Sequence, residues 1–489
     1  MGYPSLLYFT KPNKKAIDVS VFDDLQLLNF IPKRVAKSAA IPCEKENILA
    51  RQELFQRLKD DDSRAKLKTL YDISCDLYTL NTAFNDASTD EEKCIVFLFL
   101  CEAVRAFTER GSECDLSDPL SRRFASEMCA EKENEKYLNM TEQLSALLAD
   151  TENLLTNSLC VSGNKVRMTD GGADTFLNGI IACAKTLGTD IPKVKNPESR
   201  ELSPDIINGA ASLNPELMKK LKAFKSEFIS YYRANIVYYR KELEFYLTML
   251  DFTDRIRQAG IPLTYPTVGE GRIINITEAY DVSLLAKGET NIVPNDISFT
   301  TEEPFYFLTG ANGGGKTTYL RTVGIAVLMF LLGCPVPCVS ATISDISSVF
   351  THFPRDERFD GSGRFVEENN RVNAILDNMD DNSLVLLNET YSTTNEENAV
   401  KMTEKLASEL WGKRIFGLYI THQHSLSGSE IPYLNVLIDL TDENRRTYKI
   451  ARQKSVGGSY AKDILIRCGL TFEALENRFG KLDNGEGRE

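Results

Sequence analysis

The sequence is poor in histidine and tryptophan, with three of the first and one of the second among 489 residues, and it contains no CxxC pair. A zinc site needs clustered cysteine and histidine ligands, so this shortage argues against one. The 11 cysteines are scattered and odd in number, which fits a disulfide framework poorly. Free thiols in a reducing cytoplasm, the bacterial cytosol or nucleoid, fit better.

The sequence also lacks a long hydrophobic run and an excess of positive charge. Its longest apolar run, IAVLMFLLG at residues 325–333, is too short to span a bilayer. The first residues, MGYPSLLYFTKPNKK, do not have the basic-then-apolar order of a secretory signal. The 57 Lys and Arg are outnumbered by 70 Asp and Glu, a formal net charge of −13. We therefore expect no membrane partner, and any nucleic-acid contact must come from a local basic patch.

Residues 36–260 carry apolar residues every three or four positions, the pattern of amphipathic helices. The longest run begins at Pro215 and meets no Pro or Gly before Gly260. It predicts one helix of about 45 residues, a rod of roughly 65–70 Å. Residues 161–214 contain Gly171-Gly172 and prolines at 192, 197 and 204, which is typical of a loop. We expect this loop at the distal tip of an antiparallel helix pair.

After residue 266, short β-rich segments alternate with helical ones, which predicts a mostly parallel sheet covered by helices. The fold class is therefore multidomain, α plus α/β. The expected divisions are a short N-terminal segment (1–35), a helical domain (36–262), an α/β domain (263–476) and a polar tail (477–489). The alternating segments are FYFLTG (305–310), TTYLRTVGIAVLMFLLG (317–333), SLVLLNE (383–389), NAVKMTEKLASELWG (398–412), RIFGLYITH (414–422), NVLIDL (435–440) and TYKIARQ (447–453).

Residues 309–320, TGANGGGKTTYL, contain the pattern G-x-x-x-x-G-K-[ST] between a strand-like and a helix-like segment. Glycines let backbone N–H groups turn toward phosphate oxygens, Lys316 supplies positive charge, and the Thr317 hydroxyl is a ligand for Mg²⁺. The alternative is a glycine turn without a nucleotide. We expect ATP and Mg²⁺ at Gly310, Ala311, Gly313, Gly314, Gly315, Lys316, Thr317 and Thr318.

The segment SLVLLNE ends in Asn388 and Glu389, where an Asp-Glu pair is usual in such ATPases. Glu389 is placed to polarise the attacking water, unless it only caps the strand. Asn388 accepts a hydrogen bond from metal-bound water but lacks the charge, so both are candidate Mg²⁺ ligands. His422 ends the next strand-like segment and is expected to sense the γ-phosphate, unless it is a satisfied core histidine. His424 is a further candidate.

Four ordered motifs resemble the ATPase domain of the MutS family of DNA mismatch-repair proteins. They are VPNDISF (293–299), TGANGGGKTTYLRTVGIAVLMFLLGCPVPC (309–338), THQHSL (421–426) and GSYAKDILIRCGL (458–470). The helical half resembles the family's core and lever region, with ELEFYLTMLDFTDRIRQAG (242–260) similar to the last lever helix. The resemblance implies a long-helix core and lever followed by a P-loop, ABC-like ATPase domain.

The resemblance also implies that the ATPase domain forms a homodimer, with each site completed across the interface. It places Ile292, Val293 and Asn295 along the adenine and Asn312 against the phosphates. The family segment GxSTFMVEM, which acts in trans, is similar to residues 361–372. There Phe365 and Glu368 match, but Gly363 stands at the serine position. The trans-acting candidates are Ser362, Gly363 and Glu368.

Two further departures bear on function. The loop after the acidic pair reads TYSTTNEEN (390–398) in place of the family's GRGTSTYDG, and with Asn388 it indicates slow hydrolysis. Residues 1–35 leave no room before the helical half for the family's mismatch-reading and connector domains. DNA would then be contacted by the lever tip, through its phosphates and without recognition of its base sequence. The alternative is that the lysines there form only a solvated helix face. These lysines are Lys219, Lys220, Lys222 and Lys225.

Three functions stay open. The first is an ATP-gated dimeric clamp or sensor in DNA mismatch repair or related DNA maintenance. The second is an ATPase switch that binds a protein partner, which the acidic balance favours. The third is a nucleotide-binding scaffold with negligible turnover, which Asn388 suggests.

Overall fold

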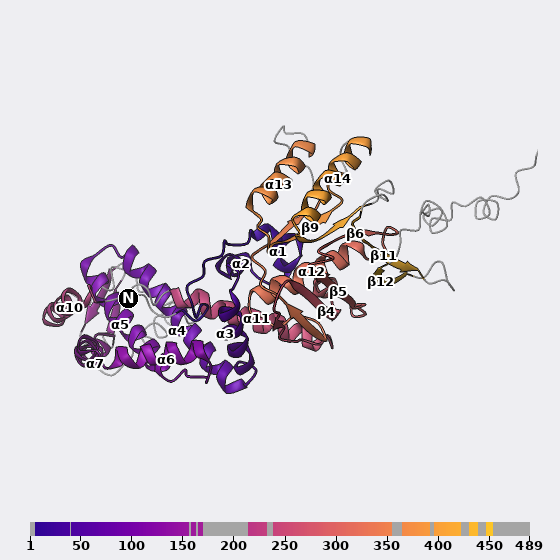
Figure 1. Ribbon diagram of the computed structural model, residues 1–489. Coiled ribbons are helices and arrows are strands. Elements are labelled where there is room, and N and C mark those ends of the chain that lie inside the picture. The colour runs from indigo at the N-terminus through magenta and orange to yellow at the C-terminus, as the bar shows by residue number, and fades with distance from the viewer. Residues whose placement is uncertain are drawn as a thin grey trace, which may run out of the picture. The chain divides into compact units, whose positions relative to one another are not determined.

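The computed structural model (Figure 1) describes residues 5–39, 41–155, 158–162, 165–169, 214–231, 238–354, 364–391, 396–421, 430–438 and 446–452. The chain forms two compact units: Met1–Phe9 with Glu53–Leu247, and Thr10–Gln52 with Thr248–Glu489. This division differs from the expected boundaries at 35 and 262. It falls inside two helices, α3 (Lys45–Arg57) and α11 (Tyr239–Gln258), and it assigns residues 10–52 to the α/β unit.

The first unit is a helical domain. Asp60, Thr89 and Asp118 cap the helices α4, α5 and α6, because each side chain accepts a hydrogen bond from a first-turn N–H. Helix α5 packs against its four neighbours through apolar faces, so it forms the centre of this unit. The helices are α4 (Asp61–Asp86), α5 (Asp90–Ser112), α6 (Pro119–Lys132), α7 (Glu135–Leu155), α10 (Pro215–Phe228) and the first part of α11.

The expectation of one helix from Pro215 to Gly260 is wrong. Helix α10 ends at Phe228, a turn follows in which Tyr231 N donates to Phe228 O at 3.0 Å, and α11 begins at Tyr239. The described residues directly after α10 are Ile229, Ser230 and Tyr231. Aromatic and β-branched residues lose χ1 freedom in a helix, and Ser and Asn compete for its backbone hydrogen bonds. The apolar period is therefore intact where helix propensity is weak.

Part of the expected distal loop is also regular. The strands β1 (Ser158–Ser162) and β2 (Lys165–Thr169) pair antiparallel as a hairpin. Residues 170–213 of the expected loop lie outside the described part of the chain.

The second unit contains two sheets. The larger has the strand order β12-β11-β6-β10-β9-β8, and its neighbours are parallel except for the antiparallel edge strand β12. This is the mostly parallel sheet that the sequence predicts, and the two units together confirm the α plus α/β class. Its strands are β6 (Phe305–Thr309), β8 (Val349–His352), β9 (Leu384–Asn388), β10 (Phe416–Ile420), β11 (Tyr433–Ile438) and β12 (Arg446–Arg452).

The smaller, mixed sheet has the order β3-β7-β4-β5 and was not expected. Its central strand β4 pairs antiparallel with both neighbours, whereas β3 and β7 are parallel. A 3₁₀ helix, η3 (Val282–Lys287), follows β4. The strands are β3 (Thr267–Val268), β4 (Ile273–Ala279), β5 (Asn295–Thr300) and β7 (Ser340–Ile343).

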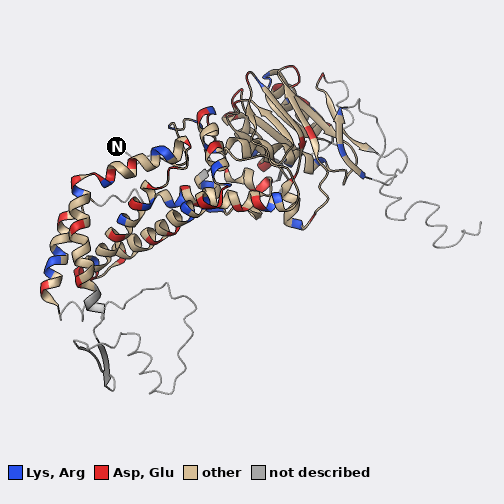
Figure 2. Cartoon of the chain, turned by 90° about the horizontal axis from the view of Figure 1, so that it is seen from below, with Lys and Arg blue, Asp and Glu red and all other residues tan. Residues whose placement is uncertain are grey.

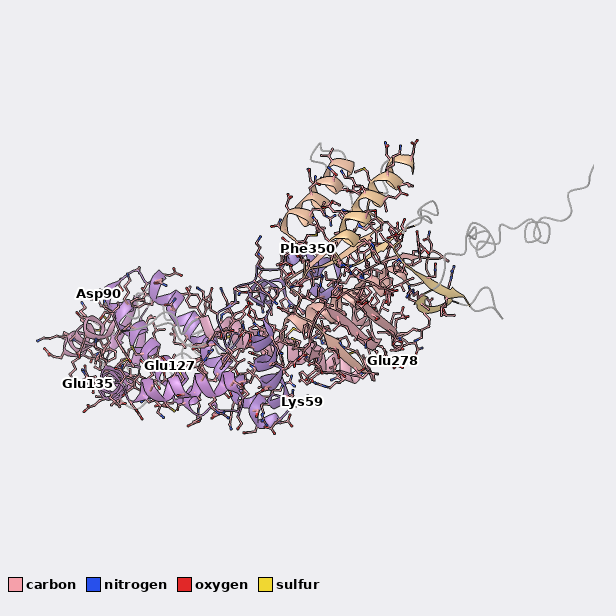
Figure 3. The ribbon with its side chains drawn as sticks, in the orientation of Figure 1. Lys59, Asp90, Glu127, Glu135, Glu278 and Phe350 are labelled. Atoms are coloured by element: carbon pink, nitrogen blue, oxygen red, sulfur yellow. The ribbon has the colours of Figure 1, made fainter. Side chains whose placement is uncertain are left out.

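Helix α12 (Lys316–Leu331) is the buried centre of this unit, because it packs against β8, β9 and β10 of the large sheet and β4 of the small one. Alternate residues of a strand point to opposite faces. Leu386 on β9 accordingly meets α12 at Gly324, while Val385 and Leu387 join the core under α13 (Arg364–Asn378) and α14 (Glu396–Gly412). Figure 1 shows α13 and α14 on the same side of β9, and Phe350 of β8, labelled in Figure 3, packs against this core.

Residues 10–52 complete the second unit. They contain α1 (Val19–Asp24), the 3₁₀ helix η1 (Leu27–Asn29), α2 (Lys33–Ala39) and the first part of α3. The backbone N–H of Cys43 and the guanidinium of Arg51 donate to the carbonyls of Leu331 and Leu332, at 2.9 and 3.0 Å. The last carbonyls of a helix have no N–H donor within the helix. Residues 10–52 supply donors to these carbonyls at the C-terminal end of α12.

No helix among the described residues has both the length and the apolar character that crossing a bilayer requires.

Candidate functional site

The loop between β6 and α12, residues 310–315, has a shape that only glycine adopts easily. Gly310, Gly313 and Gly315 have φ angles of 132°, 72° and 95°, in the region that L side chains rarely enter. Gly315 is the N-cap of α12. The glycines thus turn the chain sharply from the strand into the helix N-terminus, where the first N–H groups have no intrahelical acceptor.

Two of these glycines are also required by space. A Cβ atom on Gly310 would lie 2.8 Å from Val436 of β11, and one on Gly314 would lie 2.9 Å from both Val436 and the Ala311 carbonyl oxygen. The neighbouring strand therefore presses directly on the loop backbone. This contact fixes the loop independently of any ligand.

Lys316, the first residue of α12, folds back into the loop. Its Nζ donates to the carbonyl oxygens of Gly310 at 2.8 Å and Ala311 at 3.2 Å, and to Asn312 Oδ1 at 3.3 Å. Burial lowers the pKa of Lys316, the Glu389 carboxylate opposes this shift, Arg446 adds to it, and the pKa that results is about 8. A poorly hydrated ammonium at a helix N-terminus is a group that an anion would stabilise.

A pocket of about 230 Å³ opens at this loop. Its lining joins the loop and the start of α12 to Glu389 after β9 and to Tyr448 on β12, although these residues are far apart in the sequence. The lining residues are Asn312, Gly313, Gly315, Lys316, Thr317, Thr318, Glu389 and Tyr448.

Tyr448 is the site residue that sequence reasoning missed. It has a φ of 56°, the residue is 47% exposed, and a Cβ on Gly315 would lie 3.4 Å from its ring. An exposed aromatic face beside a phosphate-type loop suits a flat, apolar ring of a ligand. The segment TYKIARQ gave one usable signal, an aromatic residue in an edge strand, but its register beside the loop depends on the tertiary fold.

A larger hollow of about 540 Å³ lies in the same unit, lined by Asn29, Phe30, Arg255, Leu285 and Ala286. Its lining has neither a glycine-rich loop nor a carboxylate. We therefore place the candidate site at the smaller pocket, where distinct chemical groups converge.

Asn388 and Glu389 lie at the carboxyl edge of the parallel sheet, as the last residue of β9 and the residue after it. Asn388 is 7% exposed, and its Oδ1 has no hydrogen-bond partner among the described residues. An amide oxygen, the Thr317 hydroxyl and the Glu389 carboxylate are the oxygen donors that Mg²⁺ takes. Within the described residues no three His, Cys, Asp or Glu gather into a metal cluster. These donors therefore fit a Mg²⁺ ion whose remaining ligands would be phosphate oxygens.

The residues expected along the adenine are not among those that line this pocket. Asn295 binds the β12 backbone: its Nδ2 donates to Tyr448 O at 3.0 Å, and its Oδ1 accepts from Ile450 N at 2.8 Å. Ile292 and Val293 precede it, and Ile292 is buried. Asn295 thus holds the strand that carries Tyr448, and contact of these residues with adenine stays a prediction.

Several expected residues lie outside the described part of the chain: Ser362, Gly363, His422, His424 and the motif at 458–470. Glu368 is described, and it is buried on α13, where its charge adds to the effect of burial in raising the pKa of Tyr391. Its role in trans stays a prediction.

The four lysines of the expected DNA contact lie on α10, and three of them form ion pairs with acidic residues of the same unit. Lys220 lies 3.0 Å from Asp150, Lys222 lies 2.8 Å from Glu91, and Lys225 pairs with Asp90, which Figure 3 labels. Lys219 is exposed and has no ion-pair partner among the described residues. Figure 2, in which the cartoon is coloured by residue type, shows acidic and basic positions interspersed along the helices of this unit. Acidic residues of α5 and α7 thus lie beside three of the four lysines of α10.

Comparison with known proteins agrees with this geometry. Residues 306–459 match the family model described as MutS domain V. A segment of 155 residues, 31% of this chain, is 35% identical to the DNA mismatch repair protein MutS of Fervidobacterium nodosum and covers 19% of that protein. A segment of 237 residues, 44% of this chain, is 32% identical to MutS of Chlorobium chlorochromatii and covers 27% of it.

A eukaryotic relative matches as well. The DNA mismatch repair protein MSH6 of Saccharomyces cerevisiae is 30% identical over 208 residues, which are 40% of this chain and 17% of that protein. The matched segments thus span between about a sixth and about a quarter of these relatives. On the family model and these matches, the C-terminal half of this chain is similar to the MutS family.

Proposed function

We propose that this protein binds ATP with Mg²⁺ at the 310–318 loop, hydrolyses it slowly, and uses the cycle in DNA mismatch repair or related DNA maintenance. The observation that carries the proposal is the convergence of Lys316, the N-terminus of α12 and Glu389 on one pocket. The mismatch-repair names of the relatives support the biological setting.

In this proposal each group at the pocket has a separate task. Lys316 and the first N–H groups of α12 bind the terminal phosphates, and Tyr448 packs against the base. Thr317 and Asn388 would hold Mg²⁺, which when bound neutralises charge that develops on the phosphates. Glu389 orients and polarises the attacking water. Because Asn388 adds no negative charge, we expect the ion to depend more on the nucleotide than it would beside an aspartate.

Substitution of Glu389 tests hydrolysis and separates it from the scaffold alternative. Glu389→Gln keeps the size of the side chain and removes the charge that polarises water. We expect the release of phosphate from ATP to fall at least about tenfold, while ATP binding is retained. Equal, very slow release by both proteins would instead favour a nucleotide-binding scaffold.

We further propose that the α/β units of two copies form a homodimer when ATP binds, with Ser362, Gly363 and Glu368 completing the partner's site. ATP would bind the closed dimer better than the open form and would therefore shift the equilibrium toward the closed dimer. Sedimentation with ATP and with ADP, using the Glu389→Gln protein to hold ATP intact, tests this step. A molecular mass that is the same with both nucleotides would contradict it.

A protein partner in place of DNA is the second candidate, and the ion pairs of α10 favour it. Lys220, Lys222 and Lys225 are already matched by acidic residues, and the whole chain carries a formal net charge of −13. Exposed pairs contribute little to stability, so DNA phosphates could still displace them. ATP-modulated binding to duplex DNA that weakens steeply with salt would support the DNA clamp, and absent or salt-insensitive binding would favour the protein partner.

A further inference from the structure

The chain turns directly after β9, at residues 389–391, and this elbow has an unusual backbone. Glu389 and Tyr391 have φ angles of 51° and 65°, with Thr390 between them. Positive φ is uncommon for residues other than glycine, and two such residues in three are strained. Backbone of this kind persists only where neighbouring groups impose it, so the hydrogen bonds around the elbow identify what fixes Glu389.

Two buried side chains contact Thr390, one at its carbonyl and one at its hydroxyl. The hydroxyl of Tyr419 on β10 donates to the Thr390 carbonyl at 2.7 Å, and the Thr390 Oγ1 lies in hydrogen-bond contact with His352 Nδ1 at 3.1 Å. The elbow itself is tied to β10 because Glu389 N donates to Ile420 O at 3.1 Å. His352, Thr390 and Tyr419 are at most 3% exposed.

The sheet register explains why these side chains meet. His352, the last residue of β8, lies opposite Leu387 of β9, and Tyr419 on β10 lies opposite the same Leu387 from the other side. The two side chains therefore reach the residue after Glu389 from the strands on either side of β9. Neither is among the residues that line the pocket.

We propose that His352 and Tyr419 are positioning residues, which act through Thr390 to fix the direction of the Glu389 carboxylate. The inference deepens the proposed ATP hydrolysis and rests on it. A carboxylate that polarises water acts only within a narrow range of positions, and small misplacements are costly in rate. Buried hydrogen bonds on both sides of the neighbouring residue restrict that range, because losing either one leaves a buried polar group unsatisfied.

The test uses pairs of variants that differ in one polar atom. Thr390→Val removes the hydroxyl at nearly constant volume, and Thr390→Ser restores it. Tyr419→Phe removes the donor to the Thr390 carbonyl. Its matched control is Thr403→Val, because the buried Thr403 Oγ1 contacts the same Tyr419 hydroxyl at 3.0 Å from the α14 side and does not touch the elbow. For His352, Leu removes the polar atom and Asn keeps one near the Nδ1 position.

We expect Thr390→Val, Tyr419→Phe and His352→Leu to lower kcat for ATP by about tenfold while the Kd for ATP changes less than about twofold. Thr390→Ser, Thr403→Val and His352→Asn should keep most of the wild-type kcat. Circular dichroism and ATP binding identify any variant that fails to fold, and the Ser and Asn variants then decide whether the polar atom matters.

Two results would overturn the inference. One is a wild-type kcat in folded Thr390→Val and Tyr419→Phe proteins, and the other is an equal loss of affinity and kcat in both. The proposed function fails differently: wild-type protein with no ATP turnover, or turnover that Glu389→Gln leaves unchanged, would contradict hydrolysis at this site before any elbow variant is compared.

Discussion

At the scale of single residues, Lys316 is a charged group that the fold removes largely from water. Its ammonium is enclosed by loop carbonyls, and burial lowers its pKa to about 8. A bound triphosphate would raise this pKa again, because it places negative charge against the ammonium. Nucleotide binding and proton binding at Lys316 are therefore linked.

The linkage predicts how affinity depends on pH. As the pH rises above about 8, the free protein loses the Lys316 charge, so ATP binding should weaken and should take up protons. Calorimetry at pH 7 and 9, in buffers of different ionisation enthalpy, measures both effects. Lys316→Arg stays charged and should bind with little pH dependence. Affinity of the wild-type protein that is constant across this range would contradict the assignment.

Stability of the nucleotide-free protein should move the other way. Between pH 8 and the ordinary lysine value of 10.5, the unfolded chain binds more protons at this residue than the folded one. Lys316 therefore contributes a gain in the free energy of unfolding as the pH rises through that window.

Asn388 is the second informative residue, because its buried Oδ1 has no partner among the described residues. Asn388→Asp places a negative charge beside the proposed ion. We expect the Mg²⁺ concentration needed for half-maximal ATPase activity to fall, and we expect lower thermal stability when nucleotide and Mg²⁺ are removed, since the buried carboxylate is then uncompensated. A titration curve identical to that of the wild type would show that Asn388 does not face the ion.

At the scale of elements, the local sequence pattern predicted the elements around the loop, but it did not predict the features that depend on tertiary packing. The glycine loop, the strand before it and the helix after it follow from constraints within a dozen residues, as does the position of Asn388 and Glu389 at a strand end. Tyr448 and His352 could not be found this way. Only the strand order brings Tyr448 to the pocket and His352 to the elbow after β9. The helix expected from Pro215 to Gly260 failed because apolar spacing was weighed without the weak helix propensity of residues 229–231, where α10 ends.

The packing of α12 against the N-terminal segment gives an element-scale prediction. Leu25 is fully buried, and its methyl groups lie so close to Gly324 that a Cβ there would approach to 2.5 Å. Leu25→Ala should lower the free energy of unfolding by about 2–5 kcal/mol, because it leaves a cavity against a helix that cannot shift. Leu49→Ala, at a 41% exposed position of α3, is the matched control and should cost less than about 1 kcal/mol. Urea denaturation measures both, and equal small losses would contradict this packing.

At the scale of the whole molecule, the two compact units do not meet at the position where the sequence pattern changes from helical to alternating strand and helix segments. Residues 10–52 are the N-terminal part of the α/β unit, so this unit is discontinuous in sequence. Charge and periodicity could not reveal this, because the segment's contacts with Leu331, Leu332 and Asp345 join residues about 300 positions apart.

A fragment of residues 248–489 should therefore fail to form a stable nucleotide-binding unit, since it exposes the face of α12 that residues 10–52 cover. We expect poor solubility and no cooperative thermal transition. Fusing residues 10–52 to the fragment through a flexible linker should restore both properties. A fragment that folds and binds ATP without them would show that the segment is dispensable.

The most direct test of the central claim is equilibrium binding of ATP to the full chain in the presence of Mg²⁺. Wild-type protein should bind ATP, Lys316→Met should lose at least about tenfold in affinity, and Lys413→Met should bind as the wild type does, since Lys413 pairs with Glu409 on the surface of the same unit. Wild-type protein that retains neither ATP nor ADP would contradict the claim that this loop holds a nucleotide.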